Sequence, residues 1–359
     1  MNVDNMISIN DAPKLIATMG ENITVILEGE PGIGKSSVLP ILHELMGKDK
    51  YHAVYVDCPV IGDGDLVMRV PNRETGRLET YLSDLFPQDG KPYIIMLDEF
   101  LKVNKLMKTM FTRLMLERVL GDYPLPDGSI VFATSNLRTD GVGDTIEGHV
   151  GNRVMRVPVR KANHKEYLTW LTNNGASPVL RALVTIKPSL CASYVGMTPD
   201  RLNDNPYIYN PTSGNNTYAS PRSMFKADSI IKQAKVLGER LTRIALIGTV
   251  GEAAAELFNA FIMMEKDLTP IEMILKDPEV AVMPNSAGAV LMTLFNGVDV
   301  IETQDELGSF MKFVNRIDNT EFKDVFMSSL CETSRTTKLA FNNQQIMKWY
   351  QDNYKIISA

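Results

Sequence analysis

The sequence lacks several features that would point to particular protein classes. Its three cysteines, Cys58, Cys191 and Cys331, show no paired spacing, so we expect reduced thiols in a cytosolic protein. The four histidines form no metal-ligand pattern with cysteine or with one another. No run of about eighteen apolar residues occurs, which predicts that nothing spans a membrane. The first ten residues lack the basic and then apolar regions of a signal peptide.

An excess of basic residues is also missing. The 37 Lys and Arg residues are outnumbered by 43 Asp and Glu residues, which leaves a formal net charge of −6. This balance argues against a protein held on DNA by bulk electrostatics, although it leaves room for a local basic channel. The chain of 359 residues, 44% of them hydrophobic, is long enough for two or three domains with a sizeable core.

One glycine-rich stretch, residues 29–37, carries the clearest chemical pattern. It follows the apolar run Ile23–Leu27 and precedes the helix-like run Val38–Leu45, and it matches G-x-x-x-x-G-K-[ST], the phosphate-binding loop. Its glycines let the backbone wrap a phosphate chain, and the N–H groups behind them point at the anion. We expect Lys35 to reach the β- and γ-phosphates and the Ser36 hydroxyl to bind Mg²⁺. The residues predicted to bind ATP here are Glu30, Pro31, Gly32, Ile33, Gly34, Lys35, Ser36 and Ser37.

Two apolar segments end in polar residues suited to nucleotide hydrolysis. The first ends in Asp98 and Glu99, and a strand beside the loop delivers its carboxyl end to the ligand crevice. We expect Asp98 to hold Mg²⁺ through water and Glu99 to deprotonate the water that attacks the γ-phosphate. The second segment leads to Asn136, whose amide could bond the γ-phosphate or the attacking water, or could simply turn the chain.

Two further arginines are candidates for sensing or stabilising charge on the nucleotide. Arg153 stands just before the last expected strand, on the far side of the sheet from the loop. It cannot easily reach its own nucleotide, but in a ring it would face a neighbour's as an arginine finger, with Arg156 as the competitor for that role. Arg222 follows Ser220, a natural helix cap, and would report γ-phosphate loss as movement between domains. Each could also be an ordinary surface arginine.

Strand and helix patterns alternate up to residue 160 and then become helical. This order predicts an α/β fold with a doubly wound, mostly parallel sheet over residues 1–160, a helical lid over 161–268 and a helical C-terminal extension over 269–359. The alternating run Leu66–Tyr81 predicts a hairpin, and Gly141–Gly151 and Gly196–Ala219 predict loops. The expected strands are Ile23–Leu27, Tyr51–Asp57, Tyr93–Leu97, Ile130–Thr134 and Val154–Val159. The expected helices include Asp11–Met19, Val38–Met46, Val103–Leu120, His164–Thr172, Pro178–Ile186, Arg222–Leu237, Ala253–Met264, Ala287–Phe295, Asp305–Ile317, Phe322–Cys331 and Asn343–Tyr350.

Together these stretches resemble the AAA+ ATPases, most closely the MoxR-like branch. The resemblance rests on GEPGIGKS, LDEF, ATSN, the NR before the last strand, and SPRSM, and it covers about residues 20 to 265. It implies that Lys35 and Ser36 belong to Walker A and that Asp98 and Glu99 form Walker B. It also implies that Asn136 is sensor 1, Arg153 the arginine finger and Arg222 sensor 2. The hairpin around residues 72–76 is similar to an insert that this branch carries.

The resemblance also implies a function. A MoxR-like protein would hydrolyse ATP with Mg²⁺ in a ring, expected to be a hexamer, and remodel a protein partner. In bacteria or their phages, many such proteins act beside a von Willebrand A domain protein. A DNA-directed AAA+ motor or loader is the alternative, with Lys102, Lys105, Lys108 and Arg113 lining a channel or merely forming the solvated face of a helix. Glu99 argues against a scaffold that barely hydrolyses ATP, and Asn136 has no ready place in a small-molecule kinase.

Overall fold

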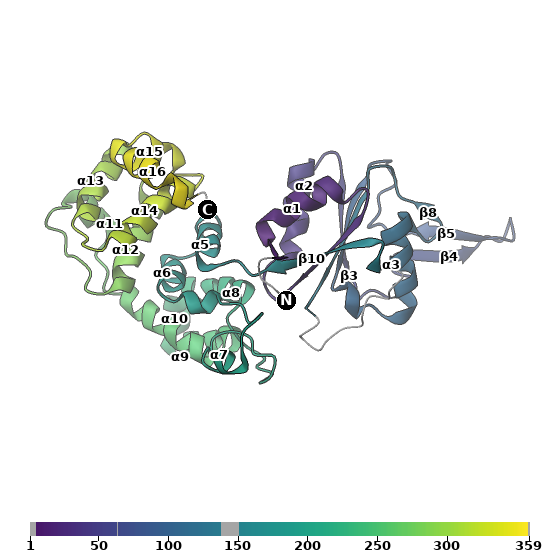
Figure 1. Cartoon of the computed structure of the whole chain (residues 1–359), viewed down its shortest axis with the longest axis horizontal. Helices are drawn as coiled ribbons and strands as arrows, with labels where there is room; N and C mark the ends of the chain where they lie inside the picture. Colours follow the sequence, from purple (N-terminus) through teal and green to yellow (C-terminus); the bar gives the residue numbers. More distant parts are fainter. Residues whose placement is uncertain (1–4, 63, 138–150, 358–359) are drawn as a thin grey trace. The chain divides into compact units, whose positions relative to one another are not determined.

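The computed structural model describes residues 5–62, 64–137 and 151–357 of the chain (Figure 1). The chain divides into two compact units, residues 1–161 and 162–359. The predicted loop Gly141–Gly151 lies almost entirely outside the described residues. In the part that is described, no helix has both the length and the apolar character needed to cross a membrane.

The first unit is built on a parallel sheet, which has six strands among the described residues. Its order is β1-β10-β2-β9-β6-β3, and every neighbouring pair is parallel. The carboxyl ends of parallel strands meet at one edge, where ligands of such sheets bind. The five expected strands are present, whereas β1 was missed because two residues are too short to show a periodic pattern. The strands are β1 (Ile7–Ser8), β2 (Thr24–Gly29), β3 (His52–Asp57), β6 (Tyr93–Asp98), β9 (Ile130–Ser135) and β10 (Val154–Arg160).

Helices cover both faces of this sheet. Alternate residues of strand β6 pack against helices on opposite faces. Ile94 and Met96 of β6 pack in one apolar cluster with α1 (Ala12–Met19) and α2 (Val38–Met46). Ile95 and Leu97 of the same strand pack in a second cluster with α3 (Lys105–Glu117). Because side chains of a strand alternate between faces, the sheet is doubly wound. The predicted fold class, α/β with a doubly wound parallel sheet followed by a helical region, is confirmed.

The helix expected over Val103–Leu120 is shorter than predicted. The structure ends α3 at Glu117, because Arg118 adopts a left-handed backbone with φ 58°. There the Arg118 guanidinium donates to the Gly20 carbonyl at 2.9 Å and to the Thr24 hydroxyl at 2.8 Å. The chain then forms a short ribbon, β7 (Val119–Leu120) and β8 (Tyr123–Pro124). Periodicity alone could not show this long-range anchor.

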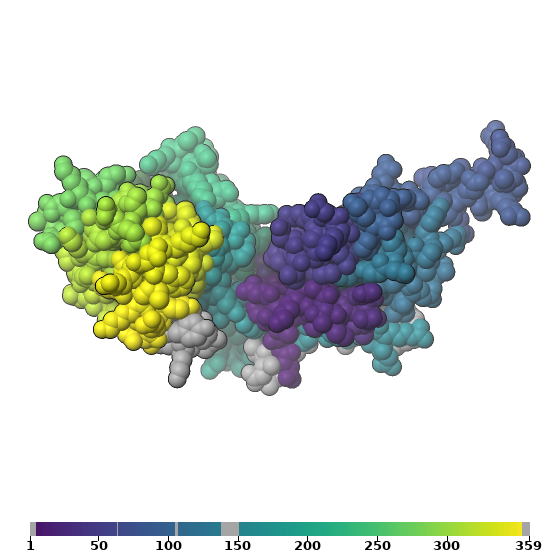
Figure 2. Space-filling view, turned by 90° about the horizontal axis from the view of Figure 1, so that it is seen from above, coloured from purple at the N-terminus to yellow at the C-terminus, as the bar shows by residue number. Residues whose placement is uncertain are grey.

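The predicted hairpin is present as β4 (Val67–Pro71) and β5 (Leu78–Leu82), paired antiparallel. The Asn72 side chain closes its turn by accepting the N–H groups of Glu74 and Thr75 at 2.8 and 3.1 Å. The hairpin extends away from the sheet (Figures 1 and 2). Met68, Val70, Leu78 and Tyr81 of the hairpin are exposed, Leu78 at 63%, whereas Val67 and Leu82 pack against an apolar cluster of the sheet.

The second unit is helical, and one apolar core includes residues from Tyr167 to Ile346. The division between lid and extension at residue 268 stays a prediction. The helices described here are α5 (His164–Asn173), α6 (Pro178–Ile186), α7 (Pro199–Asn203), α8 (Pro221–Lys232), α9 (Ala234–Val250), α10 (Glu252–Glu265), α11 (Ile271–Lys276), α12 (Ala287–Val300), α13 (Gln304–Asn315), α14 (Thr320–Glu332), α15 (Thr337–Phe341) and α16 (Gln344–Ile357).

Two expectations for this unit need correction. The helix predicted over Arg222–Leu237 is two helices that meet at Gln233, and Gly238, with φ 72°, interrupts the second one. The segment Gly196–Ala219 is not wholly irregular, because it contains α7. Within and beside it, aromatic rings pack together, with Tyr209 5.4 Å from Tyr194 and 5.0 Å from Tyr218 between ring centroids. Proline, asparagine and glycine content predicted a loop but not these ring contacts.

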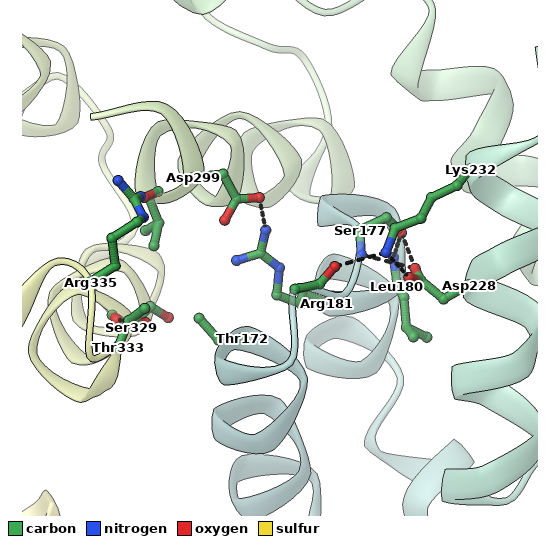
Figure 3. A network of polar contacts seen from close by, with 12 residues as sticks. Thr172, Ser177, Leu180, Arg181, Asp228, Lys232, Asp299, Ser329, Thr333 and Arg335 are labelled. Carbon is green, nitrogen blue, oxygen red and sulfur yellow. Dashed lines mark hydrogen bonds and ion pairs between the residues drawn. The ribbon is translucent and has the colours of Figure 1, made fainter. Parts of the chain in front are cut away.

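Helix α6 is tied to its neighbours by polar contacts (Figure 3). At its start, the Ser177 N–H donates to Asp228 of α8 at 2.9 Å. One turn on, Arg181 forms an ion pair with Asp299 of α12 and lies 4.9 Å from the Phe295 ring centroid. The Arg181 side chain is 1% exposed, and its Nε and Nη1 have no hydrogen-bond partner among the described residues. Burial lowers the pKa of the Arg181 guanidinium and raises the pKa of the Asp299 carboxyl, although the Asp299 side chain is still 44% exposed.

Arg181→Ala should therefore lower the free energy of unfolding by about 3 kcal/mol, mainly through the cavity it leaves. Arg181→Met should cost less than about 1.5 kcal/mol, because methionine refills the volume and removes two unpartnered nitrogens. Urea unfolding of both variants measures the difference. Arg243→Ala, which breaks an exposed ion pair with Glu256, is the control and should change stability by about 0.5 kcal/mol or less. Equal losses in both Arg181 variants would show that the charge matters more than the packing.

Candidate functional site

The glycine-rich loop wraps the lysine at its end. Lys35 is 7% exposed, and its Nζ donates to the Gly29 and Glu30 carbonyls at 2.7 and 2.8 Å. The turn needs glycine at two points, because Gly32 and Gly34 have φ 77° and 101°. Residues 35–37 then form a short 3₁₀ turn that leads into α2. The loop therefore follows the carboxyl end of β2 and opens a helix, which is the local structure that the motif requires.

The two predicted magnesium ligands lie together. The Ser36 hydroxyl donates to Asp98 Oδ2 at 3.0 Å, although 62 residues separate them along the chain. Asp98, at the end of β6, is 9% exposed. A serine hydroxyl beside a carboxylate suits Mg²⁺, which prefers oxygen ligands and keeps several waters when a protein supplies one or two groups. The donor set at this edge therefore fits the metal that the motif implies.

Glu99 follows Asp98 in a constrained backbone conformation. Its φ of 53° is unusual for a residue other than glycine, and its N–H donates to the Thr134 hydroxyl at 3.1 Å. The same Thr134 hydroxyl donates to Asp98 Oδ1, so one residue of β9 holds both acidic residues. The Glu99 carboxylate accepts from Lys102 Nζ at 2.7 Å, and both side chains are about one-third exposed. Such an exposed pair contributes at most about 1 kcal/mol, so it can open readily.

Asn136 also lies at the loop. It follows β9, and its Oδ1 accepts a hydrogen bond from Lys35 Nζ at 3.2 Å. Residues of the loop, of β6 and of β9 thus converge at the carboxyl edge of the sheet, as the sequence predicts.

Arg153 lies at the opposite edge of the sheet. Strands β10 and β2 run in register from Val154 beside Thr24 to Val159 beside Gly29, so Arg153 precedes the first pair and the loop follows the last. Five residue steps of about 3.3 Å put roughly 17 Å between these levels, more than an arginine side chain spans. Arg153 is exposed, and it cannot reach the loop of its own chain.

The competing arginine, Arg156, forms an ion pair within its own chain. Arg156 donates from Nε and Nη2 to Oε1 of Glu28, a buried residue of β2, at 2.8 and 2.6 Å. A paired guanidinium of this kind is a poor candidate for contact with another subunit. Arg222 lies in the first turn of α8, is exposed, and follows the Ser220 cap as expected. Because α8 belongs to the second unit, the role of Arg222 at the nucleotide stays a prediction.

Sequence reasoning missed two residues of this site, Thr134 and Tyr55. The Tyr55 hydroxyl, from β3, donates to Asp98 Oδ2 at 2.8 Å. Partial burial, followed by the hydrogen bond to Asp98, raises the pKa of Tyr55, although the residue is still 46% exposed. Thr134 stands inside an apolar strand end, and Tyr55 stands in an alternating strand. Thr134 lies within the ATSN motif but was given no role there, and Tyr55 matches no motif, so only strand register reveals its contact with Asp98.

Comparison with known proteins adds little to this geometry. No protein-family model matches the sequence, and no curated protein does so either. Among solved structures, a point mutant of RuvB from Thermotoga maritima is 11% identical, with 77% of this chain and 78% of that one covered and a TM-score of 0.39. NtrX from Brucella abortus in complex with ADP is 14% identical, with 70% and 66% covered and a TM-score of 0.34. Because these TM-scores are below 0.5, the similarity does not support assigning a function to this chain.

Proposed function

We propose that this protein is an AAA+ ATPase that hydrolyses ATP with the help of Mg²⁺. The observation that supports this most is the convergence of Lys35, Ser36, Asp98 and Asn136 at one edge of the sheet, linked by hydrogen bonds of 3.0 and 3.2 Å. These groups come from three separate segments. A buried lysine, a hydroxyl–carboxylate pair and an amide are the groups that phosphoryl transfer from ATP to water requires.

Each residue has a defined part in the proposed reaction. Lys35 would leave the Gly29 and Glu30 carbonyls to neutralise the β- and γ-phosphates. Ser36 would bind Mg²⁺ directly and Asp98 through water, and the ion would neutralise charge on the phosphate oxygens. Glu99, released from Lys102, would accept the proton of the attacking water. Asn136, now bonded to Lys35, would orient that water or the γ-phosphate.

A ring of subunits would complete the site. Arg153 is exposed at the edge opposite its own loop, so the nucleotide it serves would belong to a neighbouring subunit. We propose a MoxR-like ring, hexameric by resemblance, in which Arg222 couples hydrolysis to movement of the second unit. The ring would remodel a protein partner, for which a von Willebrand A domain protein is the class that the resemblance suggests. A cytoplasmic setting in a bacterium or its phage is part of the same proposal.

The DNA-directed alternative has less support. Of the basic residues that would line its channel, Lys102 is paired with Glu99 at 2.7 Å and Arg113 with Glu117 at 2.8 Å. Charges neutralised in this way attract phosphates weakly. ATPase stimulation by DNA with a steep salt dependence would restore this alternative.

Lys35→Ala tests the proposed ATPase directly. Loss of a charge-assisted contact to the phosphates should weaken ADP binding by about thirtyfold, equivalent to about 2 kcal/mol, and abolish measurable hydrolysis. Calorimetric titration of ADP and a phosphate-release assay measure the two effects. Lys50→Ala, which removes an exposed lysine from the same unit, should leave both unchanged. Unaltered ADP affinity in the Lys35 variant would rule out this loop as the nucleotide site.

A further inference from the structure

Asp98 receives three hydroxyl groups, and one of them, that of Tyr55, comes from outside the ATPase motifs. Ser36 and Tyr55 both donate to Oδ2, at 3.0 and 2.8 Å, and Thr134 donates to Oδ1. The three donors come from the loop, from β3 and from β9. Such a set holds the carboxylate in one orientation, because each oxygen is engaged from a different direction.

Strand register explains how Tyr55 reaches this carboxylate. Strands β3 and β6 pair in parallel, with Tyr55 beside Met96 and Asp57 beside Asp98. All four side chains therefore share one face of the sheet, and Asp98 is the diagonal neighbour of Tyr55. A diagonal neighbour lies within reach of an aromatic side chain that leans along its strand. Tyrosine suits this position, because its ring spans the gap and its hydroxyl remains a donor.

Counting acceptor sites shows what Tyr55 adds. An ionised carboxylate has about four lone-pair sites. Ser36, Tyr55 and Thr134 occupy three of them, which leaves about one for a water bound to the metal. Without Tyr55 a second site would open on Oδ2, and the carboxylate would have more freedom to turn about a torsion that is intrinsically broad.

We propose that Tyr55 is a positioning residue for the Mg²⁺ site: together with Ser36 and Thr134 it fixes the orientation of the Asp98 carboxylate beside the ion. This inference rests on the proposed ATPase function. Tyr55 would touch neither nucleotide nor metal, and it would act through Asp98. Residues that orient a direct metal ligand typically change metal affinity by about 10-fold to 100-fold when they are replaced. We expect the low end of this range for Tyr55, because Asp98 reaches the ion through water.

The test measures metal and nucleotide binding rather than turnover. ADP affinity is determined by calorimetry in EDTA and over a series of Mg²⁺ concentrations, and Mn²⁺ binding to the ADP complex is followed by electron paramagnetic resonance. In EDTA, Tyr55→Phe should bind ADP with an affinity within about twofold of wild type. Two other quantities should each rise about tenfold: the Mg²⁺ concentration at which the increase in ADP affinity is half complete, and the dissociation constant for Mn²⁺. A merely structural role would instead change binding in EDTA as well.

Tyr81→Phe is the matched control. Its hydroxyl also donates to a carboxylate, that of Glu79 at 2.9 Å, but on the hairpin. It should leave the metal dependence unchanged. Suppose that Mg²⁺ raises the ADP affinity of wild type and of the Tyr55 variant over the same range of concentrations. The positioning role is then overturned, while the ATPase proposal stands. If wild type binds no ADP under either condition, both proposals are overturned.

Discussion

Glu99→Gln is expected to lower the ATPase rate by about 10²-fold to 10⁴-fold while ADP and ATP still bind with nearly wild-type affinity. Glutamine keeps the size of the side chain and can still accept a hydrogen bond from the attacking water, but it cannot take the proton. The left-handed backbone at this position should be retained, because glutamine has the same carbon skeleton as glutamate and meets the same steric constraints. The ion pair with Lys102 is lost, but it is exposed and weak, so binding and stability should change little.

Two controls separate proton transfer from loss of charge. Glu117→Gln breaks a comparable exposed pair with Arg113 on α3 and should leave the rate unchanged. Lys102→Ala frees the Glu99 carboxylate without altering it, and its rate should stay within a few-fold of wild type. Single-turnover hydrolysis and equilibrium nucleotide binding measure both quantities on the same preparation. If the Glu99 variant kept more than a tenth of the wild-type rate, another group would have to serve as the base.

Local patterns predicted most of the first unit because its strands are buried runs and its loop is a compact motif. The five longer strands, the hairpin and the two acidic residues at the end of β6 were found in this way. The end of α3 was misplaced because a distant contact accompanies it: Arg118, in a left-handed conformation, bonds the Gly20 carbonyl. No window of neighbouring residues contains that contact. The break between α8 and α9 at Gln233 was also missed, because the helical pattern continues across it.

Local sequence patterns also failed to predict some of the contacts within the candidate site. Spacing between motifs predicted that Ser36, Asp98 and Asn136 would meet, since parallel strands share one carboxyl edge. It did not predict which strands are neighbours, so the contact of Tyr55 with Asp98 was invisible. The choice between Arg153 and Arg156 was also open, because it depends on Glu28 pairing with the latter across two strands. The part played by Arg222 depends on how the two units meet around a nucleotide.

Arg153→Ala should lower the ATPase rate by about 10³-fold or more, because an arginine that reaches a neighbour's nucleotide stabilises charge in the transition state. ADP affinity in the isolated subunit should not change, since Arg153 lies roughly 17 Å from its own loop along the strand. Arg156→Ala is the comparison. It leaves Glu28 buried without its partner, so it should reduce stability, and its loss of rate should follow that loss of folded protein.

Mixing two inactive variants decides whether the site is shared. In a ring that contains Glu99→Gln and Arg153→Ala subunits in equal amounts, a site works when an Arg153→Ala subunit supplies Glu99 and its neighbour supplies Arg153. Random assembly gives this arrangement at about one site in four, so the mixture should recover about a quarter of the wild-type rate per subunit. Activity should also fall on dilution, as rings dissociate. If the mixture is no more active than either variant alone, Arg153 does not act across a subunit boundary. In a mixed ring, about a quarter of the sites would combine an intact Glu99 with a neighbour's intact Arg153, so a shared site would have recovered activity.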